Sequence, residues 1–383
     1  MRFRKYSEPF IRGCFGDLIF LRKEKYDPQK DTATYPCIEL ENIEQETCLL
    51  NGYFDSKKQK SIKTKFQSGD VLFGKLRPYL RKYALVDFNG VCSTEIWALY
   101  SNKLLNSYLF YYIQTEQFLE VANTSSGTKM PRAEWNLISS KEFIYPQSRE
   151  EMGYVSHFLS KIDQRIETRS KIIEDLELYK NRIAHQLIYN NPLLDKTTPL
   201  KEYAMLKNGY AFKSDKYSES GNYKVITIAN VTGNKYISTT DCNSIETLPK
   251  DIQSHQILKL GDILISLTGN VGRVSIVNEI NCLLNQRVGV LFFTNIQLKK
   301  YLFQVLSNKL FETKMVQKGQ GAAQKNIGNE DVESFLIPIS NNLEYINKIT
   351  KVLDVLDEKL ALEKQILEKL KEQKKFLLSN MFI

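Results

Sequence analysis

The residues best suited to chemistry in this chain are cations set among glycine and aromatic residues in predicted loops. The stretch FGKLRPYLRK contains Lys75, Arg77, Tyr79, Arg81 and Lys82. Glycine allows close backbone approach, arginine grips a phosphate or a guanine edge with two donors, and tyrosine can stack on a base. A solvated turn is the commoner explanation when such a stretch stands alone.

The second half of the chain repeats this chemistry at the matching place. Its loop TGNVGR offers Gly269, Asn270, Gly272 and Arg273, and a GxxG turn can hold a phosphate on backbone amides. Each half has one more polar loop before its last strand. These loops supply Lys129 and Arg132 in the first half, and Gln324, Lys325 and Asn326 in the second. Amide side chains suit adenine edges and lysine suits phosphate or guanine, so the recurrence favours nucleic-acid contact.

Motifs for catalysis are missing from the sequence. It contains no GxxxxGK[ST] loop, no GxGxxG after a predicted strand, and no NPPY or DPPY tetrapeptide. Glu312-Thr313-Lys314 and Glu372-Gln373-Lys374 match a nuclease ExK fragment, but both fall in predicted helices, where chance matches this short are common. The three histidines are scattered, so no metal site or catalytic triad stands out. We predict a binding protein, not an enzyme, with no cofactor and no metal.

The elements that position these loops occur twice in the same order. Gly69-Asp70-Val71-Leu72 corresponds to Gly261-Asp262-Ile263-Leu264, and FIYP at 143–146 corresponds to FLIP at 335–338. Each half shows β-rich runs, then an aromatic helical stretch, a polar loop and a final apolar strand. The aromatic residues of that stretch recur at helical spacing, so we expect most of their rings to lie in the core. We predict an α+β fold with two similar mixed α/β domains, at residues 1–148 and 191–340. Each carries four more basic than acidic residues, which suits a polyanion that touches both.

A long heptad stripe follows each predicted domain, at residues 149–190 and 341–383, with the second copy 194 residues after the first. A stripe this regular needs a partner helix, and the other copy is the obvious one. We predict an antiparallel coiled coil with pseudo-twofold symmetry. Its seam comprises Leu159, Ile162, Ile166, Arg169, Ile173, Leu176, Leu353, Leu356, Leu360, Glu363, Leu367 and Leu370. Arg169 and Glu363 are either snorkelling charges or an interhelical ion pair. Lys180 and Lys374 are a second pair of charged residues at equivalent positions of the two stripes.

Composition limits the class of protein. The chain has 383 residues, 42% hydrophobic and 25% charged, which fits a protein of two or three globular domains. It shows no apolar run long enough for a membrane span and no convincing signal peptide. The six cysteines form no CxxC pair, which is typical of reduced thiols. We expect a cytoplasmic protein without membrane association.

Taken together, these features resemble the specificity subunit of Type I restriction–modification systems. The resemblance rests on GDVLFGKLRPYL, GDILISLTGNVGR, the IP-type end of the last strand and LDEKLALEKQILEKLKEQKKFLLSNMF, and covers nearly the whole chain. It implies two DNA-reading domains, one for each half of a bipartite, asymmetric target. It implies that the long helices are two conserved regions that act as spacer and docking surface.

The resemblance also implies partners. Double-stranded DNA is the first, and two methyltransferase (modification) subunits carrying S-adenosylmethionine are the next, with restriction subunits as further partners. Two alternatives remain at this point. One is a coiled-coil scaffold that binds only proteins, and the other is a stand-alone DNA methyltransferase or nuclease.

Overall fold

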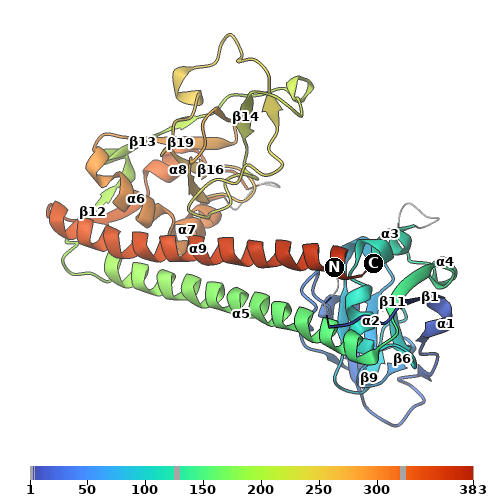
Figure 1. The fold of residues 1–383 in the computed structure, drawn as a ribbon. Helices are drawn as coiled ribbons and strands as arrows, with labels where there is room; N and C mark the ends of the chain where they lie inside the picture. The colour runs from blue at the N-terminus through green and yellow to red at the C-terminus, as the bar shows by residue number, and fades with distance from the viewer. Residues whose placement is uncertain (1–2, 4, 125–129, 320–324, 383) are drawn as a thin grey trace. The chain divides into compact units, whose positions relative to one another are not determined.

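The structure is a computed structural model that describes residues 3, 5–124, 130–319 and 325–382. It divides into two compact units. Unit 1 comprises Met1–Ser170 with Ile366–Ile383, and unit 2 comprises Lys171–Gln365. Figure 1 colours the chain from blue to red, with the long helix α5 (Arg149–Ile188) in green and the long helix α9 (Leu343–Met381) in red. Each unit therefore contains a globular part and a segment of both long helices.

Unit 1 is built on antiparallel and mixed sheets. A four-stranded sheet has the order β2-β10-β7-β8, a five-stranded sheet the order β3-β6-β9-β4-β5, and β1 pairs with β11. The strands are β1 (Phe10–Cys14), β2 (Ile19–Leu21), β3 (Lys25–Tyr26), β4 (Pro36–Ile38), β5 (Phe54–Asp55), β6 (Lys63–Phe66), β7 (Val71–Gly74), β8 (Tyr83–Leu85), β9 (Gly90–Cys92), β10 (Ile96–Ser101) and β11 (Glu142–Pro146). The short helices are α1 (Phe15–Leu18), α2 (Asn106–Tyr112), α3 (Glu116–Asn123) and α4 (Trp135–Ser139).

Unit 2 repeats much of this plan. Its four-stranded sheet has the order β13-β19-β16-β17, a three-stranded sheet has the order β15-β14-β18, and β12 pairs with β20. The strands are β12 (Lys196–Pro199), β13 (Ala204–Asn208), β14 (Tyr223–Ile226), β15 (Ser244–Ile245), β16 (Ile263–Ser266), β17 (Val274–Ile276), β18 (Cys282–Leu284), β19 (Val288–Phe293) and β20 (Leu336–Ile339). The helices are α6 (Lys299–Leu306), α7 (Lys309–Lys318) and α8 (Asn329–Glu333). The prediction of mixed α/β halves is confirmed.

The aromatic helical stretch is broken in both units. Residues 106–123 and 299–318 each form two helices, because Thr115 and Asn308 cap the second helix with their side chains. Thr115 Oγ1 accepts from Phe118 N and Asn308 Oδ1 accepts from Leu310 N. The rings of the first helix are buried in the core, as the helical spacing predicted.

Within each unit the long-helix segments join the core. In unit 1, Val155 and Leu159 of α5 share a cluster with Leu377 and Met381 of α9. In unit 2 the ion pairs Glu177–Lys364 and Lys180–Asp357 show that the segments run in opposite directions. Lys364 Nζ lies 2.7 Å from Glu177 Oε1. No helix in the described part of the chain has the length and apolarity needed to cross a bilayer.

Candidate nucleic-acid interface

Two basic segments that lie far apart in the sequence meet in unit 1. Arg77 N donates to Pro131 O at 2.8 Å, and Ala133 N donates to Lys75 O at 2.9 Å. Leu76 and Arg132 form a β-bridge between these bonds. Residues 75–82 and 130–132 therefore form one surface, here called surface 1.

The corresponding segments of unit 2 meet through the same backbone pattern. Gly269 N donates to Lys325 O and Ile327 N donates to Leu267 O, both at 2.9 Å. Thr268 and Asn326 form the bridge. Residues 268–273 with 325–326 are here called surface 2. The sequence predicted both loop groups in each half, and the structure brings the described members of each half together.

The backbone of both surfaces turns through left-handed conformations. Arg77 has φ 52° and Arg81 has φ 50° in surface 1. Gly269 and Gly272 hold the corresponding positions in surface 2, with φ 72° and 81°. Equivalent backbone bonds at the base of each turn establish this correspondence. Gly74 N donates to Lys82 O in unit 1, and Ser266 N donates to Arg273 O in unit 2. Glycine adopts this conformation freely and arginine rarely does, so surface 1 holds two arginines in strained backbone.

Several cations of surface 1 already have internal partners. Arg81 donates to both carboxylate oxygens of Glu116 at 2.9 and 3.0 Å, and Arg132 holds Glu95 at 3.0 and 3.2 Å. Lys82 Nζ donates to Leu40 O at 2.6 Å. Burial is the largest single effect and acts to lower the pKa of Arg81, but the hydrogen bond to Glu116 and the negative charges of Glu116 and Glu46 together raise the pKa. Arg81, Arg132 and Lys82 therefore stabilise the conformation of surface 1 through intramolecular bonds.

The side chains of Arg77 and Tyr79 in surface 1 are exposed to solvent, and that of Lys75 is half-buried. Tyr79 is 53% exposed. Within the described ranges, neither these two side chains nor that of Lys75 has a hydrogen-bond, ion-pair or ring partner. The groups free to bind an external anion or base are therefore Lys75, Arg77 and Tyr79.

Surface 2 presents a different set of groups. Asn270, Lys325 and Asn326 are exposed. The amides of Gly269 and Gly272 donate inside the protein, to Lys325 O and Ser266 O, so these two are not offered to a phosphate. A Cβ at Gly272 would lie 2.7 Å from Met315 Cβ, so this glycine allows the turn to pack on α7.

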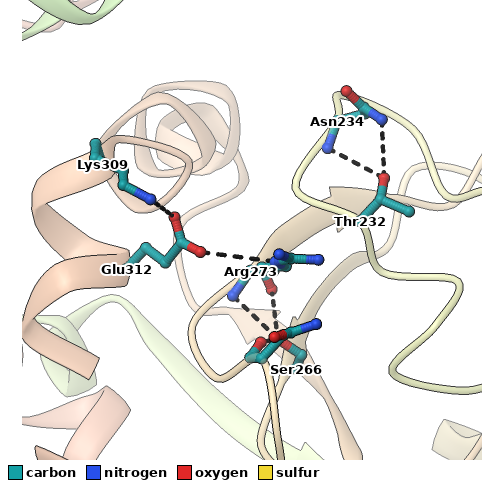
Figure 2. A network of polar contacts seen from close by, with 7 residues as sticks. Thr232, Asn234, Ser266, Arg273, Lys309 and Glu312 are labelled. Carbon is teal, nitrogen blue, oxygen red and sulfur yellow. Dashed lines mark hydrogen bonds and ion pairs between the residues drawn. The ribbon is translucent and has the colours of Figure 1, made fainter. Parts of the chain in front are cut away.

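Arg273, the last residue of the surface 2 turn, makes a long ion pair. Figure 2 shows its side chain next to Glu312, with Nε 3.6 Å from Oε1, while Lys309 Nζ lies 2.7 Å from Oε2 of the same glutamate. The Arg273 amide donates to Ser266 Oγ at 3.0 Å. Two of the predicted contact residues, Lys129 and Gln324, lie outside the described residues. The contact roles of all these side chains stay predictions.

A partly buried ion pair that the sequence patterns did not predict occurs once in each unit. In unit 1, Lys374 Nζ lies 2.7 Å from Asp163 Oδ1, and Tyr111 donates to Asp163 Oδ2 at 2.9 Å. In unit 2, Lys180 pairs with Asp357, and Gln304 Nε2 donates to Asp357 Oδ2 at 2.8 Å. The signal was present in the sequence, because the aspartates are separated by the same 194 residues as the lysines.

Arg169 and Glu363 fall in different units, so their pairing stays a prediction. Within the described ranges, no group of three or more His, Cys, Asp or Glu side chains is placed to hold a metal ion.

Comparison with protein families identifies the family of this chain. The Type I restriction modification DNA specificity domain matches twice, at residues 14–178 and 196–372. The chain belongs to this family. Both surfaces lie within the matched ranges, one in each specificity domain.

Individual relatives agree with this family. The chain is 34% identical over 73 residues to the EcoDI specificity subunit of Escherichia coli, a match that spans 19% of this chain and 16% of that relative. The S subunit of the Type I system of M. genitalium has the same fold, with a TM-score of 0.61 at 16% identity, covering 98% of this chain and 97% of that one. A chain from a structure of Type I complex assembly and conformational transition gives 0.58 at 18% identity, covering 97% and 98%.

Proposed function

We propose that this specificity-family chain recognises a bipartite, asymmetric sequence in double-stranded DNA, with one reader in each half. Residues 1–148 and 191–340 are the readers, and surfaces 1 and 2 contact the DNA. The observation that carries the proposal is that both surfaces are assembled by the same backbone bonds but present different side chains. Phosphate contacts position a protein on DNA, whereas base-edge contacts specify sequence, so surfaces that differ in their side chains suit unlike half-sites.

The long helices serve as the spacer in this proposal. They form an antiparallel coiled coil that relates the readers by a pseudo-twofold axis. The ion pairs Asp163–Lys374 and Lys180–Asp357 support it, because one register of α5 against α9 satisfies both. Buried charges of this kind specify register more than they add stability.

The same helices dock two modification subunits, which supply the methyltransferase, and restriction subunits join that complex. Several large apolar side chains of the unit 2 segments support docking because they are exposed: Leu178, Tyr179, Val352, Val355 and Leu362. Val352, Val355 and Leu362 share one face of α9, since their spacings are close to whole helical turns. Exposed apolar patches of this kind mark protein interfaces. The chain itself is non-catalytic and needs no cofactor.

Methyl transfer with purified components tests the division of labour. Labelled S-adenosylmethionine and random-sequence duplex DNA are incubated with this chain, with modification subunits, or with both. Label enters DNA only when both are present, if the proposal holds. Transfer by this chain alone would instead identify a stand-alone methyltransferase, and cleavage by it alone a nuclease.

A further inference from the structure

Unit 2 contains a polar cleft next to surface 2, with which it shares Gly272 and Arg273. It has a volume of about 520 Å³ and lies between the long-helix segments, the 232–236 loop, the turn after β16 and the α6–α7 junction. Figure 2 shows part of its wall, with Arg273 and Glu312 on one side and Thr232 and Asn234 on the other. On α9 the cleft is lined by Asp357, Ala361 and Lys364, about half a helical turn away from the exposed apolar face. It is therefore separate from the proposed docking surface.

The lining of this cleft is net positive. It carries five cations, namely Lys180, Lys235, Arg273, Lys309 and Lys364, and three acids, namely Glu177, Glu312 and Asp357. Each acid already pairs with a cation of the cleft. Glu312 is shared by Arg273 and Lys309, and Lys235 has no carboxylate partner within the described ranges. The charge left over suits an anion.

Two hydrogen-bonding atoms in the wall have no partner among the described residues, and they are Ser307 Oγ and Asn308 Nδ2. Asn308 is only 6% exposed. Its Oδ1 accepts from Leu310 N at 2.9 Å to cap α7, which fixes Nδ2 as a donor. An unpaired buried donor is unfavourable unless water or a ligand satisfies it, and this one lies at the positive end of a helix, which favours an anion.

The first half closes the corresponding place with its own side chains. Gln114 stands where Ser307 does, donating to Phe110 O at 2.9 Å and accepting from Cys48 Sγ at 3.6 Å. Lys374 Nζ in turn lies 3.7 Å from the Cys48 sulfur. Cys48 lies in a loop, residues 43–50, that is closed by a bond from Asn42 Nδ2 to Asn51 O. The equivalent bond in unit 2, from Asn230 Nδ2 to Ser238 O, closes the loop 231–237, which is one residue shorter. Unit 2 thus lacks both groups that fill this space in unit 1.

We propose that the unit 2 cleft binds a phosphate group. Arg273 and Lys309 supply charge, while Ser307 and Asn308 supply neutral donors. Such a mixture matches the several acceptor oxygens of phosphate. The group comes either from a small phosphorylated molecule or from the DNA backbone. The depth of Asn308 favours the small molecule, because a rigid duplex does not enter a cleft of this size.

Calorimetric titration of the full chain with inorganic phosphate, at ionic strength held constant with chloride, tests the site. Wild type is expected to bind saturably. Asn308→Asp keeps the α7 cap but replaces the donor with a carboxylate, so phosphate binding weakens by about tenfold to a hundredfold. Lys348→Gln is the matched control: it makes the same change in net charge on the exposed surface of α9, beside Glu344, and leaves binding unchanged.

A second variant guards against misfolding of the first. Ser307→Gln introduces the residue that unit 1 uses, and it fills the cleft and abolishes phosphate binding. Helix content and thermal midpoint, measured by circular dichroism, show that each variant is folded. Absence of saturable binding by wild type would overturn the proposal, as would wild-type affinity in both folded variants, since the cleft would then hold only water.

Duplex DNA distinguishes the two sources of phosphate. If Ser307→Gln loses inorganic phosphate but binds DNA as wild type does, the ligand is a small phosphorylated molecule. If DNA affinity falls together with phosphate affinity, the ligand is a backbone phosphate. Neither result depends on the two-reader proposal, which the loss of a sequence-specific half-site tests separately.

Discussion

Replacing Arg77 with glycine is expected to stabilise the protein while weakening its DNA binding. Arg77 holds φ 52°, and glycine holds the corresponding position 269 in unit 2. The Arg77 side chain has no intramolecular partner in the described ranges, so within them this conformation is held by backbone bonds such as Arg77 N to Pro131 O. Arg81 is strained in the same way, but its guanidinium holds Glu116. Arg77 is therefore the residue of surface 1 at which a left-handed backbone carries a side chain left free for the proposed DNA contact.

The size of the effect follows from the backbone. A left-handed conformation costs a residue with a Cβ about 1–2 kcal/mol. Glycine loses about 0.4–1 kcal/mol of this gain because it makes the unfolded chain more flexible. Arg77→Gly should therefore raise the free energy of unfolding by about 0.8 kcal/mol, the midpoint of a range from about 0 to 1.6 kcal/mol. Loss of an arginine contact to DNA should weaken one half-site by about 1–3 kcal/mol, roughly fivefold to 150-fold.

Urea unfolding and fluorescence anisotropy on the same samples measure both effects. Arg77→Ala is the matched control, because it keeps the Cβ and removes the guanidinium: stability stays within about 0.5 kcal/mol of wild type and DNA binding falls as in the glycine variant. Arg81→Gly gains less than Arg77→Gly because it loses the Glu116 pair. Wild-type DNA affinity in both Arg77 variants would refute the contact. An Arg77→Gly protein less stable than Arg77→Ala would refute the strain argument.

Three further predictions concern the ion pairs and surface 2. Asp357→Asn should destabilise the chain by about 3 kcal/mol in urea unfolding. Asp163→Asn should cost less, because the Asp163 side chain is 22% exposed and that of Asp357 only 6%. Equal losses of stability in the two variants would contradict this prediction. Stability should fall as pH rises above about 10. Burial and Asp163 raise the pKa of Tyr111, while Cys48 and Asp163 raise the pKa of Lys374 against the effect of burial. Both groups stabilise the fold while protonated, so a flat stability profile from pH 9 to 11 would contradict this prediction. Arg273→Ala should weaken the second half-site about tenfold in anisotropy and leave the first unchanged, whereas equal loss at both would argue against separate readers.

Much of the fold could be predicted because the two halves of the sequence contain the same succession of elements. The GD-[IV]-L strands, the aromatic helices and the final strands recur in order, and hydrophobic spacing placed Tyr108 and Tyr301 in the core. The break in each aromatic helix was missed. Thr115 and Asn308 have extended backbone conformations, which let their side chains cap the helix that follows. Hydrophobic periodicity continues across both positions and therefore does not reveal the break.

The candidate site was predictable as residue types but not as geometry. Sequence composition identified the basic loops, whereas their meeting depends on long-range backbone bonds such as Arg77 N to Pro131 O. The internal pairing of Arg81 and Arg132 needed Glu116 and Glu95, which lie on other elements. The unit 2 cleft follows from a loop one residue shorter and a serine in place of a glutamine, which spacing alone does not reveal.

Selection from a random duplex library by the chain with its modification subunits tests the central claim most directly. The account predicts that bound DNA contains two different conserved blocks separated by a spacer of fixed length and free sequence. Arg77→Ala should relax only one block and Arg273→Ala only the other. A single continuous motif, two identical blocks, or one variant that relaxes both blocks would contradict two separate readers on one chain.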